Sequence, residues 1–214
     1  VGTLTVDDTA PGVTAATTAD TNDNGQIDEV TVTFDEDMDD DSITQSDFSV
    51  SSNSIDGISV NGGSDDATVT LSLAESGSPD TGAKPTVQIA DGQSVQDLAG
   101  NSLAGGDTGH SVMATDGAAP VLISAIQQSS NTVAVEFSES VTEKGDAGDE
   151  SKIDMGGIGG TGDDLAYINN NDAAGTSATS IASISAGADN ADGKVIATLD
   201  NDLTSADLGS DQIR

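Results

Sequence analysis

Hydrophobic and polar residues alternate with a period of two along much of this chain. The segment EVTVTF at 29–34 places two valines and a phenylalanine on one face and two threonines on the other. That alternation is typical of a strand with one buried face. Similar short apolar runs lie at 46–51, 55–60, 67–73 and 85–90, separated by clusters of Gly, Asn, Asp and Ser that favour turns. The spacing predicts an antiparallel β-sandwich.

The hydrophobic pattern of the first half returns in the second half. The segment VTVTFDEDM at 30–38 aligns with VAVEFSESV at 133–141, and Pro11 aligns with Pro120. With the prolines superposed, Asp7 falls on Asp116. Further along, SIASISAG at 180–187 aligns with SIDGISVN at 54–61. A period near one hundred residues has the size of a domain, so the chain is interpreted as two copies of one unit.

This alignment predicts three segments. Residues 1–9 form a leading strand and linker that belong to a preceding or neighbouring domain, residues 10–116 form domain 1, and residues 117–214 form domain 2. Domain 2 is incomplete at its C-terminal end, because nothing in it aligns with DLAGN at 97–101 or with the strand expected at 110–114. Two explanations stay open. The chain is a piece of a longer tandem array, or Val1–Val6 of one subunit adds as a strand to the open edge of its neighbour.

The loop ahead of the 29–34 strand has the oxygen pattern of a calcium loop. In DTNDNGQID at 20–28, side-chain oxygens alternate, and a glycine allows the sharp bend that turns them inward. Position twelve of the helical calcium motif is Thr31, so the bidentate glutamate of that motif is absent, and we expect an affinity of about 10⁻⁴–10⁻³ M. The alternative is an Asn-Gly turn that simply ends one strand. The predicted Ca²⁺ ligands are Asp20, Asn22, Asn24, Gln26 (through its backbone carbonyl) and Asp28.

A second candidate calcium site lies at the domain junctions. Asp7 and Asp8 precede domain 1, and Asp116 stands at the equivalent position before domain 2. These carboxylates are predicted to hold an ion between successive domains. The alternative is a polar linker without a ligand.

Charge dominates the composition. Thirty-eight acidic residues face five basic ones, a net charge of −33, and the chain has no cysteine. Nucleic acid and anionic membranes require a basic surface and are excluded as partners. No apolar run approaches the roughly 20 residues of a membrane helix, which excludes membrane insertion. The composition is similar to that of proteins from salt-loving microbes, whose dense surface carboxylates stay hydrated and keep the chains apart in concentrated salt. The alternative hypothesis is that the chain is intrinsically disordered at low salt.

Several of these segments resemble a known family. They are the opening APGV at 10–13, VTVTFDEDM at 30–38, SDFSV at 46–50 and, above all, VQDLAGNSL at 95–103. Together they resemble the bacterial Ig-like domains found in tandem in surface-layer proteins, adhesins and large secreted proteins. The resemblance covers residues 10–115 well and residues 118–214 more weakly. It implies an all-β fold of tandem Ig-like antiparallel β-sandwiches.

The resemblance and the charge together favour a structural role. We expect a repeat unit of an extracellular, cell-surface assembly of a halophilic microbe (a surface layer, stalk or filament), stabilised by calcium and salt. Its partners would be copies of itself or further Ig-like domains. The alternatives are an adhesin or carbohydrate-binding module, using the Gly/Asp/Asn-rich insertion at 142–180, and an accessory domain of a secreted hydrolase. An enzyme is not expected, because nucleophile elbow, phosphate loop and zinc spacing are absent.

Overall fold

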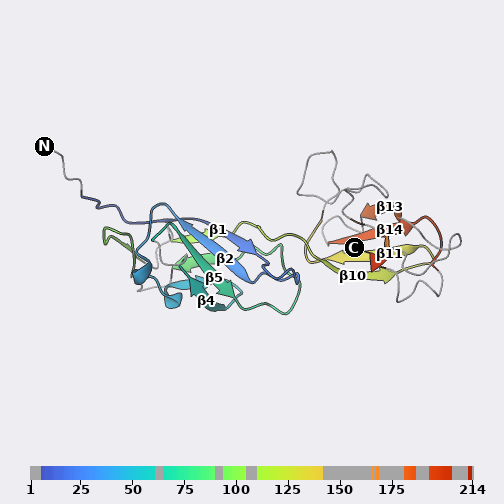
Figure 1. Cartoon of the computed structure of the whole chain (residues 1–214), viewed down its shortest axis with the longest axis horizontal. Helices are drawn as coiled ribbons and strands as arrows, with labels where there is room; N and C mark the ends of the chain where they lie inside the picture. The colour runs from blue at the N-terminus through green and yellow to red at the C-terminus, as the bar shows by residue number, and fades with distance from the viewer. Residues whose placement is uncertain are drawn as a thin grey trace. The chain divides into compact units, whose positions relative to one another are not determined.

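The chain divides into two compact units, Val1–Ala119 (unit 1) and Pro120–Arg214 (unit 2), each described here by itself (Figure 1). The computed structural model describes residues 6–60, 65–89, 94–104, 110–141, 165, 167–168, 181–186, 193–203 and 212–213. Residues 1–5 of the predicted leading strand lie outside the described residues, as does most of the insertion at 142–180.

Unit 1 contains two main antiparallel sheets and a hairpin. Its elements are β1 Val13–Ala19, β2 Glu29–Phe34, the 3₁₀ turns η1 Asp40–Ser42 and η2 Gln45–Asp47, β3 Phe48–Val50, β4 Ile55–Ser59, β5 Thr68–Leu73, β6 Thr86–Ile89, β7 Ser94–Gln96, β8 Ser102–Ala104 and β9 Ser111–Met113. One sheet has the order β1-β2-β5-β4, the other has the order β3-β6-β9, and β7 pairs with β8. All of these strand pairs are antiparallel.

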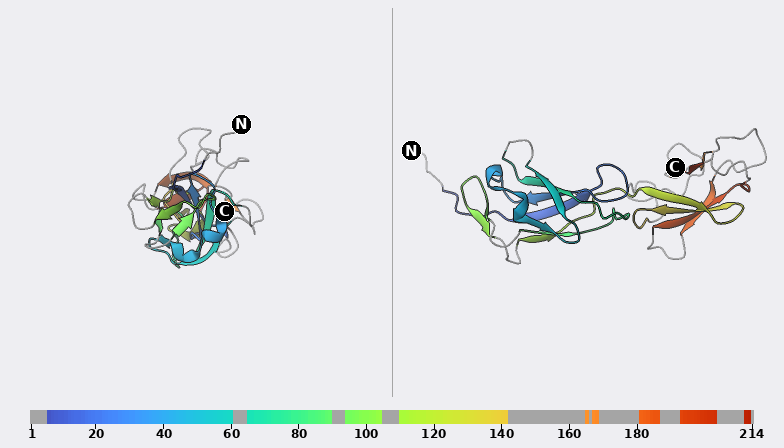
Figure 2. Two further views of the ribbon diagram at one scale, coloured as in Figure 1. Left: turned by 90° about the vertical axis from the view of Figure 1, so that its left-hand side faces the viewer. Right: turned by 90° about the horizontal axis from the view of Figure 1, so that it is seen from below.

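The two sheets of unit 1 pack face to face around one hydrophobic core (Figure 2). In β2 the inward positions Val30, Val32 and Phe34 are buried, and the residues between them are half-buried, as the period of two predicts. Phe48 of β3 and Ile89 of β6 belong to the same core from the opposite sheet. The all-β, antiparallel sandwich prediction is confirmed.

Unit 2 has a four-stranded sheet of the same design. Its strands are β10 Leu122–Gln127, β11 Thr132–Phe137, β12 Tyr167–Ile168, β13 Ile181–Ala186, β14 Lys194–Leu199 and β15 Gln212–Ile213. The sheet order is β10-β11-β14-β13, and β12 pairs with β15. Leu165 and Ile213 pack on the core that this sheet forms, together with Val135 and Leu199.

The sheets of the two units agree in register as well as in strand order. Val13 pairs with Phe34 in unit 1 and Leu122 with Phe137 in unit 2, and each pair is followed by a one-residue irregularity before the next one. A second irregularity recurs in the pairing of β4 with β5 and of β13 with β14. Bulges of this kind are fixed features of a sheet rather than defects. Phe34 and Phe137 therefore occupy the same place in their respective sheets.

Among the described residues, no helix has the length and hydrophobicity that a membrane span requires.

The core of unit 1 gives a first prediction. Leu71 of β5 is fully buried, whereas its neighbour Ser72 is exposed. We expect Leu71→Ala to reduce the free energy of unfolding of unit 1 by about 2–5 kcal/mol, because it removes buried methyl groups and leaves a cavity. Urea unfolding in concentrated NaCl, with hydrogen exchange to assign the loss to unit 1, measures the effect. The matched control Ser72→Ala should change stability by less than about 0.5 kcal/mol, and equal effects of the two substitutions would contradict the described core.

Candidate metal centre

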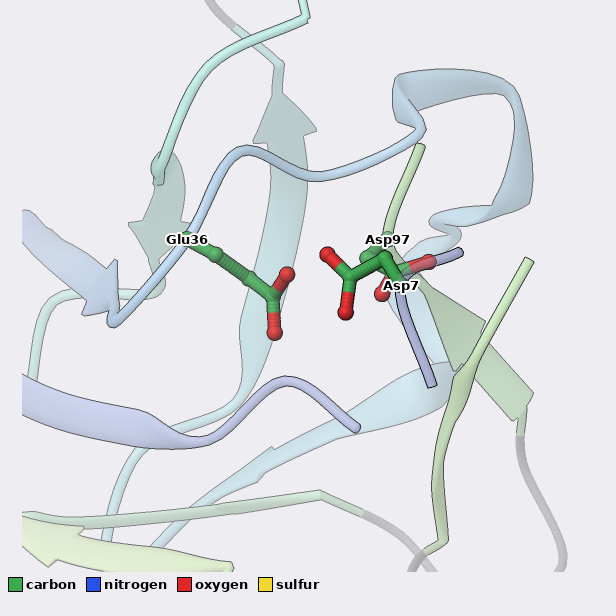
Figure 3. A group of neighbouring side chains, drawn as sticks. All are labelled: Asp7, Glu36 and Asp97. Atoms are coloured by element: carbon green, nitrogen blue, oxygen red, sulfur yellow. The ribbon is translucent and has the colours of Figure 1, made fainter. Parts of the chain in front are cut away.

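Three carboxylates that are distant in sequence converge at one end of unit 1. Asp7 comes from the linker before β1, Glu36 lies two residues after β2, and Asp97 follows β7 directly. One oxygen from each lies within 4.8 Å of the others (Figure 3). Asp7 is exposed, Glu36 is half-buried and Asp97 is only 2% exposed. The group thus reaches from the surface into the sandwich.

The DLAGN turn places the buried carboxylate. One oxygen of Asp97 accepts hydrogen bonds from the backbone N–H groups of Ala99 and Asn101, each at 2.8 Å. The other oxygen accepts the side-chain amide of Asn101 at 2.7 Å. Gly100 has a φ of 88°, in the left-handed region that favours glycine. The motif that carries the family resemblance is therefore a turn built around one aspartate.

The same turn connects the three segments of the group. The side-chain amide of Asn101 also donates to the backbone carbonyl of Asp7 at 3.3 Å, which holds the linker against the turn. The segment after β2 is tied to β7 by a bridge between Met38 and Asp97 and by a hydrogen bond from the N–H of Asp39 to the carbonyl of Gln96 at 2.9 Å. Each carboxylate is thus held by backbone contacts of its own segment.

The electrostatics of the group differ from one carboxyl to the next. Burial raises the pKa of Glu36, and the neighbouring charges of Asp97, Asp7 and Asp35 raise it further, in that order. Burial also acts to raise the pKa of Asp97, but the hydrogen bonds from Asn101, Ala99 and Gly100 outweigh it and hold this pKa below its usual value. The surroundings of Asp97 therefore favour its ionised form, whereas those of Glu36 disfavour the ionised form of that carboxyl.

The donor set suits a hard cation. All three side chains offer carboxylate oxygens, the ligands that Ca²⁺ prefers, and none is a nitrogen or sulfur donor of the kind that selects zinc. A divalent ion would neutralise the repulsion that raises the pKa of Glu36. The residues present therefore fit calcium.

Of the three aspartates predicted for an inter-domain site, one belongs to this group of carboxylates. Asp7 belongs to the group with Glu36 and Asp97, whereas Asp8 and Asp116 are exposed residues outside it. Sequence reasoning missed the other two members. One signal could have found Glu36: in the alignment of VTVTFDEDM with VAVEFSESV, the acid that recurs is Glu36, at the position of Glu139, while the aspartates on either side align with serines.

The predicted calcium loop at 20–28 connects β1 to β2 and is closed by its own side chains. Asp20 accepts the backbone N–H groups of Asn24 at 3.3 Å and Gly25 at 2.7 Å. Asp28 accepts the N–H and the hydroxyl of Thr21 at 2.9 and 2.7 Å. Gly25 has a φ of 89°, which is the bend that the sequence pattern requires. The oxygens of Asp20 and Asp28 thus stabilise the loop backbone in the described structure.

A residue from another loop enters this one. Glu75, which follows β5, accepts the side-chain amides of Asn22 at 2.9 Å and Asn24 at 2.7 Å on one oxygen. Its second oxygen accepts the side-chain amide of Gln26 at 3.5 Å. Asp80 from the same region accepts the N–H of Ile27 at 2.8 Å. Periodicity and spacing gave no indication of either residue, because the contacts span about fifty positions.

A groove lies at another part of unit 1. It has a volume of about 540 Å³, opens widely to solvent and is lined by no titratable side chain. Its lining residues are Gln45, Ser46, Phe48, Ser49, Val50, Asn53, Ser54 and Ile55. Acid–base chemistry has no candidate group in this groove.

A family model described as a bacterial Ig-like domain matches residues 7–115, a span that begins at Asp7 and ends at Thr115. No curated protein and no solved structure matches the chain.

The raised pKa of Glu36 gives a prediction for the metal-free protein. Above that pKa the ionised Glu36 is repelled by Asp97 and Asp7 in the folded state, so Glu36→Gln should raise the melting temperature at pH 7 in EDTA. The gain should vanish as the pH falls below 4.5, the ordinary value, because Glu36 is then protonated in both the folded and unfolded states. Differential scanning calorimetry across this range measures the difference. The exposed Asp37→Asn is the control, and a lower melting temperature for Glu36→Gln at pH 7 in EDTA would contradict the assignment.

Proposed function

The chain belongs to the bacterial Ig-like domain family, whose members are typical of bacterial surface and extracellular proteins and are generally non-catalytic; from this premise we propose that it is a structural repeat of an extracellular assembly, held together by calcium and adapted to high salt. The assembly would be a surface layer, a stalk or a filament. Its partners would be copies of this chain or further Ig-like domains.

The observation that carries the calcium proposal is the convergence of Asp7, Glu36 and Asp97 within 4.8 Å. A bound Ca²⁺ would join the linker to two separate segments of the sandwich, so it would fix the point at which the chain enters unit 1. Such an ion stabilises the folded state alone, because the three segments separate on unfolding. The loop at 20–28, with Glu75, is the second calcium site that we propose.

The high-salt proposal rests on charge. The chain has a net charge of −33 on 214 residues. Its carboxylates repel one another at distances shorter than the screening length. That length is about 10 Å at 0.1 M salt and about 3 Å at 1 M, so concentrated salt confines the repulsion to neighbouring groups. A sandwich with few large aromatic side chains has little surplus stability to oppose this repulsion in dilute buffer.

Calcium should raise the melting temperature of unit 1. With dissociation constants of about 10⁻⁴–10⁻³ M, about 10 mM Ca²⁺ in concentrated NaCl should stabilise the folded state by roughly 1.4–2.7 kcal/mol per site. Calorimetry against equal MgCl₂ measures the effect, since Mg²⁺ demands a smaller octahedral site. The double variant D7N/E36Q should lose the part of the calcium-dependent rise in melting temperature that comes from the carboxylate group. The double variant D20N/D28N should lose the part that comes from the loop at 20–28, and Asp37→Asn should keep the whole rise. An unchanged melting temperature with calcium, or the same rise in every variant, would reject the calcium proposal.

Salt should stabilise the chain independently of calcium. In EDTA, raising NaCl from about 0.1 M to about 2 M should raise the melting temperature and restore β-sheet circular dichroism, because screening weakens carboxylate repulsion. The variant D37N/D41N, which removes two exposed charges from the acidic run after β2, should need less salt for the same stability. A chain equally stable in dilute buffer would contradict the high-salt proposal.

A further inference from the structure

The outer face of the four-stranded sheet in unit 2 carries an apolar row that crosses neighbouring strands. Val133 of β11 and Val195 of β14 are buried in the core. Side chains alternate between the two faces of a strand, so Ala134 and Ile196, which follow them, point away from the core. Ile126 of β10 pairs with Ala134, and Ala134 pairs with Ile196 (Figure 1). These three side chains form the apolar row on the outside of the sheet.

Part of this row is open to solvent. Ile126 is 57% exposed, and Ile123, three residues earlier on the same edge strand, is 38% exposed. Ala134 and Ile196 are half-buried. Single exposed apolar side chains are common on protein surfaces, whereas several of them gathered on one face mark a surface for association with another molecule.

Unit 1 shows that the fold itself does not require this row. The shared register gives each residue of the row a counterpart in unit 1, and all three counterparts are threonines: Thr17, Thr31 and Thr70. The same strand order and register therefore form with hydroxyl side chains on the outside. The core of unit 2 lies on the other face of the sheet, so the two isoleucines of the row are not needed to fill it.

The same face carries no net charge. The four strands of the sheet contain one acidic residue, Glu136, and one basic residue, Lys194. These two residues lie opposite each other beside the apolar row, with 3.4 Å between the Oε1 and Nζ atoms. Their side chains are 43% and 48% exposed. In a chain of net charge −33, the strands of this sheet therefore add nothing to the repulsion of a second acidic molecule.

The positions of the two charges suit a second copy of the same face. In a twofold dimer each contact occurs twice, with the roles of the two copies exchanged. If two such sheets pack face to face about an axis that runs along the strands between β11 and β14, Ala134 faces Ile196 of the second copy. By the same operation Glu136 faces Lys194 of the second copy. The charges of one face are then neutralised by those of the other.

We propose that the outer face of the unit 2 sheet binds the same face of a second copy of this chain, with the apolar row at the centre and Glu136 and Lys194 beside it. This contact names a partner and a surface for the assembly proposed above, and to that extent it rests on the proposed function. Because both copies use the same surface, the contact closes after two molecules.

The size of the face sets the expected strength of the dimer. Four strands about 4.8 Å apart, with six residues that rise about 3.3 Å each, cover roughly 400 Å². Two faces of that size bury less than the roughly 1,200 Å² at which stable complexes begin, so the dissociation constant should be on the order of 10⁻⁵–10⁻⁴ M. Concentrated salt should favour the dimer, because it screens the repulsion between the acidic surfaces of the two copies.

Sedimentation velocity tests the contact. In about 2 M NaCl and at about 100 μM, the chain should sediment as a reversible dimer. The double variant I126T/I196T gives unit 2 the residues that unit 1 has in the same row, so it should fold with unchanged circular dichroism. Its dimer should be weaker by about tenfold or more, because the apolar contact is lost. The matched control T17S/T70S, on the outer face of unit 1, should keep the dimer.

Mixing two charge variants identifies the surface. The variants E136K and K194E each place two like charges on the face, so each alone should dimerise more weakly than the unmodified chain. An equimolar mixture, with one variant fluorescently labelled, should form a heterodimer, because two lysines of one copy then face two glutamates of the other. A contact within one molecule cannot be restored by mixing, so this result would assign the pair to the interface.

The outcomes separate this contact from the calcium and high-salt proposals. A chain that stays monomeric under these conditions, or a dimer that I126T/I196T leaves unchanged, overturns the face-to-face contact. A mixture of E136K and K194E that forms no more dimer than either variant alone also overturns it. A monomer whose melting temperature still rises with calcium and salt rejects this contact alone. A dimer that depends on the apolar row, without any such rise, supports the contact and rejects the other two proposals.

Discussion

Carboxylates without basic partners are the constraint on which this structure depends. With thirty-eight acids and five basic residues, salt bridges cannot neutralise the surface. In unit 1 the loops use backbone N–H groups instead. Asp35 accepts the N–H of Gly12 at 2.7 Å, Asp66 accepts that of Thr68 at 2.6 Å, and Asp20, Asp80 and Asp97 do the same in their own loops. Charge-assisted hydrogen bonds of this kind are stronger than neutral ones, so the acids stabilise turns that lack other support. At Glu36, burial and the nearby carboxylates of Asp97, Asp7 and Asp35 raise the pKa instead, so this carboxyl group is favoured in its neutral form.

The strand pattern was readable from sequence because it rests on local alternation. The segment 30–34 shows one apolar face, and the structure buries that face. The boundaries of β4, β5 and β6 lie within a residue of the apolar runs, since turn-forming residues border each run. The equivalence of the two halves could also be inferred, because their sequences repeat one another around Phe34 and Phe137. What alternation could not give is which strands form one sheet, since β2 pairs with β5, about forty residues away.

The candidate sites were predictable only in part, for a related reason. The predicted calcium loop at 20–28 is local, so its spacing can be recognised in the sequence. Glu75 and Asp97 reach their sites through the packing of strands far apart in sequence, and a single sequence does not report such contacts. Asp97 lay inside the motif that carried the family resemblance, but the sequence alone indicated only a turn there and no metal ligand. Its carboxylate role follows from the position of β7 beside the segment after β2, and that position is a property of the sandwich.

One amide couples the start of the chain to the interior of unit 1. The side chain of Asn101 binds the buried carboxylate of Asp97 and the backbone of Asp7 at the same time. Tension applied along the incoming linker would therefore act on two elements, the first strand and, through Asn101, the β7–β8 hairpin. In a chain of several such domains, each domain with the same turn would have this second attachment between its linker and its hairpin.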